Sequence, residues 1–181
     1  MELPNSPRIP IYQAPTGSIA GPELAAAVAA VGGMGAMGLT WTTPDEARRK
    51  VEWVRRRTGG SFQANFALHF EPAALASVLE AGVPVVTFSW GLPVREAALV
   101  RSFGAGLGIQ VASPEGARRA LEFEPDFLVC QGIEAGGHVQ SMLPLWKVLP
   151  EVVEAASEVP VVAAGGIATG AAIARAIAVG A

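Results

Sequence analysis

Short apolar runs alternate with helical segments along the whole chain, and this alternation restricts the possible folds more than any other feature. Seven runs of mostly apolar residues are expected to be strands: 9–14, 34–38, 62–68, 84–89, 107–112, 126–131 and 160–164. Each run is followed by a segment rich in Ala or Glu with helical character. Repeated strand–helix pairs of this length predict a parallel sheet with helical crossovers.

Seven successive βα units predict an α/β fold of the TIM (β/α)8 barrel type, because doubly wound sheets usually contain fewer strands before their first long insertion. We expect a single domain over residues 1–181, incomplete at its C-terminal end because the eighth strand is missing. A hydrophobic content of 51% fits one compact core. The unpaired edges of strands one and seven would invite self-association.

Composition excludes several classes of protein. No apolar stretch approaches the roughly 18 residues of a membrane span, so no membrane partner is expected. The start, residues 1–7, has no basic-then-apolar signal pattern, which favours a cytoplasmic protein. Cys130 is the only cysteine, so internal disulfides and cysteine-rich metal sites are excluded, and no metal site is predicted. Its place within a strand indicates a small buried residue and not a nucleophile.

Six of the thirteen basic residues lie in the segment 48–57, which raises the question of nucleic-acid binding. The same segment reads as an amphipathic helix with Val51, Trp53 and Val54 available to pack. The net charge is −3, so we interpret the basic residues as a solvated helix face and expect no nucleic-acid partner. Residues 43–46, Thr-Pro-Asp-Glu, predict the start of this helix by a capping box, and residues 113–115 start another helix similarly.

The most distinctive stretch follows the sixth predicted strand. Gln131 ends the strand, and a glycine-rich turn with Gly132, Gly136 and Gly137 leads to His138. The glycines can adopt backbone angles closed to other residues, and His138 would be displayed at the C-terminal end of the strand, where α/β folds place their chemistry. The alternative is a loop histidine without a function. Glu134 could be a general acid or base, although a loop carboxylate is ordinarily solvated.

Two further glycine motifs differ in what they indicate. Residues 33–38 match G-x-G-x-x-G, but a helix precedes them and the glycines lie within the strand itself, so close packing is favoured over dinucleotide binding. In residues 161–170 a strand runs into Gly165 and Gly166 and then into a helix. Free N–H groups at a helix N-terminus bind phosphate, and the alternative is simply a tight βα turn.

Polar residues near strand ends are further candidates. Residues 14–17 close the first predicted strand, Asn65 interrupts the apolar third strand, and Gln110 lies in the fifth. A buried amide needs hydrogen-bond partners, which a flavin ring or the neighbouring backbone would supply for Asn65. His69 is expected at the surface.

Together, the Gln-Gly-Ile-Glu-Ala-Gly-Gly-His sequence at 131–138 and the Ala-Ala-Gly-Gly-Ile sequence at 163–167 resemble the nitronate monooxygenase family, formerly called 2-nitropropane dioxygenases. Ala14–Pro15 and Asn65–Phe66 agree with the family pattern. Members of the family are FMN-dependent barrels that oxidise alkyl nitronates with O2. A sister branch contains flavin-dependent enoyl-thioester reductases, which this signature does not separate cleanly.

The resemblance implies FMN as the cofactor and His138 as the catalytic residue. The implied FMN-binding residues are Ala14, Pro15, Thr16, Asn65, Gln110, Gln131, Gly136, Gly165 and Gly166, the last two at the phosphate. Two departures from the family pattern matter. Many members have Met where this chain has Thr16, and the Gly-Thr phosphate loop of the family's eighth strand has no counterpart here.

The function implied is an FMN-dependent oxidoreductase whose small-molecule partners are an alkyl nitronate and O2. His138 would act as a base on a neutral nitroalkane, or would hydrogen-bond the nitro oxygens. The first alternative is a flavin-dependent enoyl-thioester (enoyl-ACP) reductase of the same fold. The second is an inactive, truncated flavin-binding remnant.

Overall fold

The computed structural model describes residues 6–181. The chain divides into two compact units, the first ending at Leu107 and the second comprising Gly108–Ala181. The stretch 1–5, on which part of the expectation of a cytoplasmic protein rests, lies outside the described residues.

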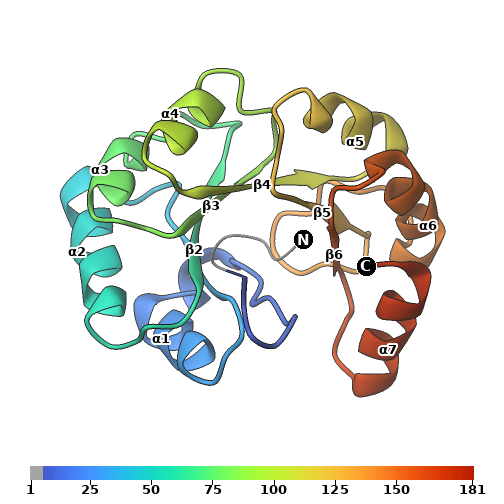
Figure 1. Ribbon diagram of the computed structural model, residues 1–181, viewed down its shortest axis with the longest axis horizontal. Coiled ribbons are helices and arrows are strands. Elements are labelled where there is room, and N and C mark those ends of the chain that lie inside the picture. Colours follow the sequence, from blue (N-terminus) through green and yellow to red (C-terminus); the bar gives the residue numbers. More distant parts are fainter. Residues whose placement is uncertain (1–5) are drawn as a thin grey trace. The chain divides into compact units, whose positions relative to one another are not determined.

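Unit 1 alternates helices with three parallel strands. Its elements are η1 (Gly17–Ile19), α1 (Pro22–Ala30), β1 (Gly35–Gly38), α2 (Pro44–Arg55), β2 (Phe62–Ala67), α3 (Leu75–Glu80), β3 (Val85–Ser89) and α4 (Glu96–Ser102). Strand β2 pairs in parallel with both β1 and β3. The helices lie along one side of these strands (Figure 1), and α1 packs directly on β1.

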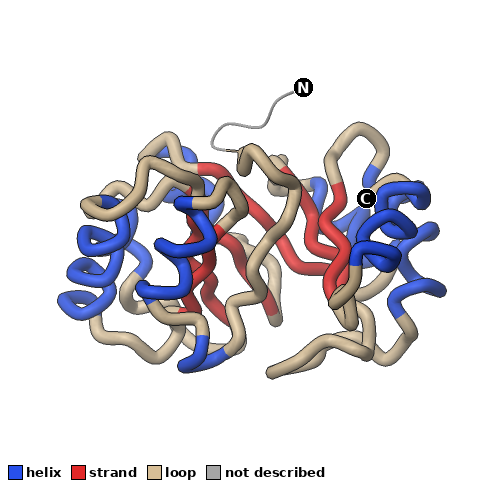
Figure 2. The backbone as a smooth tube through the Cα atoms, turned by 90° about the horizontal axis from the view of Figure 1, so that it is seen from below, coloured by secondary structure: helices blue, strands red, loops and turns tan. Residues whose placement is uncertain are grey.

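Unit 2 repeats the same plan. Its elements are β4 (Gly106–Val111, which begins at the end of unit 1), α5 (Pro114–Leu121), β5 (Phe127–Gln131), α6 (Leu145–Ala156), β6 (Val161–Ala164) and α7 (Gly170–Val179). Strand β5 pairs in parallel with β4 and β6. Figure 2 shows these strands beside the layer of helices that covers them. Helix α6 packs against α5 and against both β5 and β6.

The basic segment is a solvated helix face, as predicted. Val51 and Val54 of α2 are fully buried, and the basic side chains lie on the rest of the helix. Trp53 is only half-buried, and the guanidinium of Arg57 lies 3.6 Å from the centre of its ring. In unit 1 the buried face of the sheet includes Phe66 and Phe88, whose ring centres are 6.4 Å apart.

The predicted N-cap hydrogen bonds of Thr43 and Ser113 are present, whereas the Glu46 side chain, predicted to complete a capping box, pairs with Lys50. The Thr43 hydroxyl accepts the N–H of Glu46 at 3.4 Å, and the Ser113 hydroxyl accepts the N–H of Gly116 at 3.0 Å. The Glu46 carboxylate pairs with Lys50 at 2.8 Å. Each of the two caps therefore satisfies one of the N–H groups that the first helical turn leaves without a partner.

The first predicted strand is wrong. Within the described residues, the segment 9–14 forms only an isolated parallel bridge, between Tyr12 and Met34. Pro10 and Pro15 lack the N–H that a ladder needs, and this limits regular pairing at the segment's two ends. Residues 6–181 thus contain six strands where the sequence predicts seven.

The same segment nevertheless binds β1 through the side chain of Gln13. The Gln13 amide donates to the carbonyl of Ala36 at 3.0 Å and accepts the N–H of Ala36 at 3.1 Å. These are the two bonds that a neighbouring strand's main chain would make. Gln13 thus ties the chain before η1 to the first strand, a role that sequence reasoning missed.

The G-x-G-x-x-G match at 33–38 reflects close packing, as predicted. The backbone of Gly35 lies directly against the carbonyl of Ala25 in α1, and a Cβ at Gly35 would overlap it. A Cβ at Gly38 would lie 3.2 Å from the carbonyl oxygen of Pro15. These glycines therefore let α1 and the chain before it approach β1.

Cys130 is fully buried, and burial raises the pKa of its thiol to about 12. A thiol with so high a pKa is a poor nucleophile, so the interpretation as a buried apolar residue is confirmed. No helix among the described residues combines the length and the hydropathy needed to span a bilayer.

Candidate functional site

Gln131 ends β5 with a buried side chain that binds the loop beyond it. Its amide donates to the carbonyl of His138 at 3.3 Å and accepts the N–H of Gln140 at 2.7 Å. The Gln140 side-chain oxygen in turn accepts a hydrogen bond from the Gln110 amide of β4 at 3.2 Å. Three amide side chains therefore connect β4 and β5 with the loop between β5 and α6, residues 132–144.

Glu134 holds the same loop from the other side. Its carboxylate accepts the N–H of Leu145, the first residue of α6, at 2.9 Å. Pro144, at the N-cap position, has no side chain that caps the helix, so Glu134 supplies that bond from eleven residues upstream. Its observed role is to cap α6. Sequence reasoning missed this role because no local spacing links residue 134 to a helix that begins at 145.

The glycines of the loop serve different purposes. A Cβ at Gly132 would lie 2.5 Å from the backbone nitrogen of Leu145 and 2.6 Å from the Glu134 carboxylate, so lack of space requires glycine there. Gly137 has φ of 76°, a conformation that favours glycine. Gly136 has neither feature: no atom lies within 4 Å of a Cβ placed there. The expectation of special backbone angles therefore holds for Gly137 only.

His138 is exposed. Its backbone carbonyl accepts a hydrogen bond from Gln131, and it lies just after the C-terminal end of a parallel strand. Ends of this kind are where α/β folds carry catalytic groups. His69 of unit 1 is also exposed, as predicted, and its ring contacts that of Phe70 at 5.2 Å.

The turn between β6 and α7 lies against this loop. Gly165 and Gly166 have φ of 125° and 68°, which other residues rarely adopt. A Cβ at Gly165 would lie 3.2 Å from the nitrogen of Ala135, and one at Gly166 would lie 3.2 Å from the Cβ of Glu134. The hydroxyl of Thr169 accepts the N–H of Ala172 at the start of α7, at 3.2 Å. The structure thus brings Gln110, Gln131, Gly136, Gly165, Gly166 and His138 together within unit 2.

The predicted residues of unit 1 lie at or near the C-terminal ends of its strands. The Asn65 amide donates to the backbone oxygen and to the hydroxyl of Thr87 on β3, at 3.2 and 3.1 Å. The neighbouring strand therefore provides the partners that its NH2 group needs. Ala14, Pro15 and Thr16 precede η1, where the Thr16 carbonyl accepts the N–H groups of Ile19 and Ala20, both at 3.2 Å.

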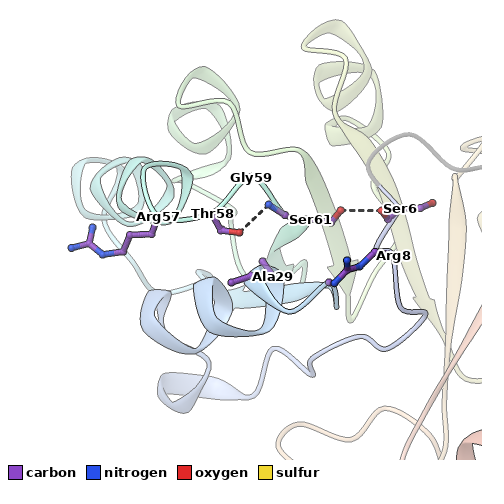
Figure 3. A pocket seen from close by; sticks show the side chains of 10 residues that line it. Ser6, Arg8, Ala29, Arg57, Thr58, Gly59 and Ser61 are labelled. Carbon is purple, nitrogen blue, oxygen red and sulfur yellow. Dashed lines mark hydrogen bonds between the residues drawn. The ribbon is translucent and has the colours of Figure 1, made fainter.

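A pocket in unit 1 lies elsewhere. It has a volume of ≈ 520 Å³ and is lined from segments 6–8, 29–32 and 57–61, which precede β1 and β2 (Figure 3). Its polar groups already bind one another: the Thr58 hydroxyl accepts the N–H of Gly60 at 2.9 Å, and the Ser61 hydroxyl donates to the Ser6 carbonyl at 3.0 Å. The guanidinium of Arg8 donates to the carbonyl of Val31 at 3.3 Å. This end of parallel strands usually serves stability.

Comparison with known proteins agrees with the signature. The family model described as "Nitronate monooxygenase" matches residues 6–76 and 70–181. A nitronate monooxygenase of Paraburkholderia phytofirmans is 31% identical over 95% of this chain and 60% of its own length. The chain thus spans about 60% of the length of this curated relative.

Two solved structures match this chain about equally well. FabK from Thermotoga maritima gives a TM-score of 0.91 at 32% identity, covering 97% of this chain and 56% of that protein. Nitroalkane oxidase from Streptomyces ansochromogenes gives 0.89 at 30% identity, covering 97% and 64%. These matches confirm the predicted α/β fold of the TIM-barrel type. On the family model and the shared signature, this chain belongs to the nitronate monooxygenase family.

Proposed function

We propose that this protein is an FMN-dependent oxidoreductase that oxidises alkyl nitronates with O2. The observation that carries the proposal is the presentation of His138: Gln131 and Glu134 hydrogen-bond backbone groups of the loop, and His138 lies exposed just after the end of β5. The family match supports the reaction class. The chain covers about 60% of the relative from Paraburkholderia, so the activity of the whole protein is part of the proposal.

The residues of unit 2 fit a flavin mononucleotide. A phosphate needs backbone donors and a positive electrostatic environment, both of which the N-terminus of a helix offers. The turn at Gly165 and Gly166 leads into α7 with φ values that only glycine adopts readily. We place the FMN phosphate there, with Gln110, Gln131 and Gly136 as further contacts. In unit 1, the contacts implied by the family resemblance are Ala14, Pro15, Thr16 and Asn65.

The chain's own contribution to the chemistry is made by His138. FMN, when bound, would carry the electron transfer. His138 would take the α-proton of a neutral nitroalkane, or donate a hydrogen bond to the nitro oxygens as negative charge gathers there. The buried amide of Gln131 keeps the backbone at residue 138 fixed, so the ring works from a defined position.

A flavin-dependent enoyl-thioester reductase is the second candidate. The match to FabK is as close as the match to the nitroalkane oxidase, with TM-scores of 0.91 and 0.89. For this function, a bound flavin would supply the hydride chemistry for reduction of a thioester-bound alkene. An inactive flavin-binding remnant is the third reading.

Two measurements distinguish these readings. The visible absorbance of the purified chain with added FMN reports binding, and oxygen uptake with an alkyl nitronate reports turnover. We expect bound flavin and nitronate-dependent oxygen uptake. Flavin binding with oxidation of NAD(P)H by an enoyl thioester, and without nitronate turnover, would support the reductase. Flavin binding without either activity would support the remnant, and no binding would contradict the FMN site.

We also propose self-association of the isolated chain. Among the described residues β6 pairs with β5 on one side only, and strand edges of this kind pair readily with other chains. Sedimentation velocity should show concentration-dependent oligomers. A single monomeric species across the concentration range would contradict this.

A further inference from the structure

We infer that Gln131 is the positioning residue for His138, acting through its side-chain amide on the backbone of residues 138–140. This inference deepens the proposed function and rests on it for the role of His138. The geometry itself is independent of that role. Gln131 belongs to β5, is 6% exposed, and lies seven residues before the histidine that it would hold.

The two ends of the Gln131 amide have different tasks. Its nitrogen donates to the His138 carbonyl, and its oxygen accepts the Gln140 N–H. Turning the amide over would put two donors face to face and two acceptors face to face, so the orientation is fixed by its partners. A carboxylate at this position could keep only the bond from Gln140, and an aliphatic side chain could keep neither.

The segment around His138 depends on these bonds. Residues 136–139 contain no helix or strand, and two glycines immediately precede His138. Two further hydrogen bonds hold the loop on either side of this segment: Ile133 donates to the Leu143 carbonyl at 2.9 Å, and Leu145 donates to Glu134. Without the Gln131 amide, the backbone at His138 would lose a buried partner.

Gln140 connects the two hydrogen bonds of the Gln131 amide to the neighbouring strand, β4. Its side-chain oxygen accepts from Gln110 on β4 at 3.2 Å, while its N–H binds Gln131. The loop backbone is thereby tied to β4 and β5 at once. Displacing a catalytic group by about 1 Å can lower the reaction rate by about 10²-fold. The hydrogen bonds of Gln131 and Gln140 would therefore affect turnover without touching the substrate.

The test uses the fact that the chain has only two histidines, His69 and His138. In protein labelled with ¹³C-histidine and kept free of FMN, which Gln131 is itself proposed to contact, each histidine gives its own ring signal, and His138→Gln assigns them. The variants are Gln131→Leu, which removes both bonds, and Gln131→Glu, which keeps the acceptor for Gln140. The matched control is Gln63→Leu, a buried glutamine of β2 whose side-chain oxygen has no partner in the described part of the chain.

We expect both Gln131 variants to shift or split the His138 signal and to leave the His69 signal unchanged, while Gln63→Leu changes neither. With a neutral nitroalkane, whose α-proton His138 would take, kcat should fall by about 10²-fold in Gln131→Leu, with a much smaller change in KM. An unchanged His138 signal in folded Gln131→Leu would overturn the inference. Should that variant not fold, the His138 signal of Gln131→Glu decides in the same way. A shifted signal in a chain that turns over no nitronate would keep the positioning role and reject the proposed function.

Discussion

Removing the carboxylate of Glu134 should loosen the first turn of α6. The Glu134 carboxylate accepts the N–H of Leu145 at 2.9 Å, and Pro144 offers no side-chain cap of its own. Two variants separate the contributions. Glu134→Gln keeps an acceptor oxygen and removes the negative charge, whereas Glu134→Ala removes both.

The size of the effect follows from the cap and the charge. Loss of a helix cap costs about 0.5–2 kcal/mol, and loss of a negative charge near a helix N-terminus costs about 0.3–1 kcal/mol. Glu134 is exposed, so we expect losses in the lower half of these ranges: about 1.5 kcal/mol for Ala, which loses both the cap and the charge, and about 0.5 kcal/mol for Gln, which loses the charge alone. For a chain of this size, Glu134→Ala should lower Tm by about 3–6 °C.

Hydrogen exchange gives the sharpest reading, because it reports on a single amide. If the first turn of α6 opens locally, a loss of about 1.4 kcal/mol in the free energy of opening makes the Leu145 amide exchange about tenfold faster in Glu134→Ala. The control is Glu151→Gln, which changes an exposed carboxylate in the body of the same helix. If the Leu145 amide exchanged at the same rate in Glu134→Ala as in Glu151→Gln, the reasoning would be refuted.

Four further predictions test the site and the core. His138→Ala should lower kcat by about 10²–10⁴-fold and leave FMN absorbance unchanged; turnover within a few-fold of the parent would contradict its role. Gly166→Asp should reduce FMN occupancy more than it reduces Tm, because a carboxylate would repel the phosphate; full occupancy would place the phosphate elsewhere. Gly35→Ala should lower the free energy of unfolding by about 1–3 kcal/mol in urea, because its Cβ would overlap Ala25; an unchanged midpoint would contradict this. Burial raises the pKa of Cys130 to about 12, so at neutral pH a thiol reagent should label it only after unfolding; rapid labelling of the native chain would contradict this.

The sequence predicts the repeating architecture well because each repeat has a local cause. Caps such as Thr43 and Ser113 need only two or three neighbouring residues, and both are present in the structure. The segment 9–14 is wrongly predicted to be a strand because its apolar composition suits one. Pro10 and Pro15 limit its regular pairing, and the side chain of Gln13 makes two of its bonds to β1, which no periodicity in the sequence indicates.

The position of the candidate site could be predicted from the sequence, but the contacts made by its residues were less predictable. The strand end at Gln131 and the glycine turn at 165–166 are where the sequence puts them. The partners of Glu134 and Gln131 are eleven and seven to nine residues away, and they become visible only once the loop is folded. Gly136 shows the opposite error, since its sequence context suggested a backbone demand that the structure does not contain.

The different structural roles of residues 131–138 explain why this signature identifies a family more readily than a reaction. Gln131 and Glu134 bind backbone groups, and Gly132 makes room for the start of α6. His138 is exposed and its backbone carbonyl is held by Gln131, so the sequence pattern specifies how a histidine is held at the end of a strand and specifies little about what it meets. Enzymes with different substrates can then share the pattern, because the requirement on the loop is the same in each. Side chains that select a nitronate or an enoyl thioester are therefore expected outside residues 131–138, and substitutions there should change the substrate while the loop and its hydrogen bonds persist.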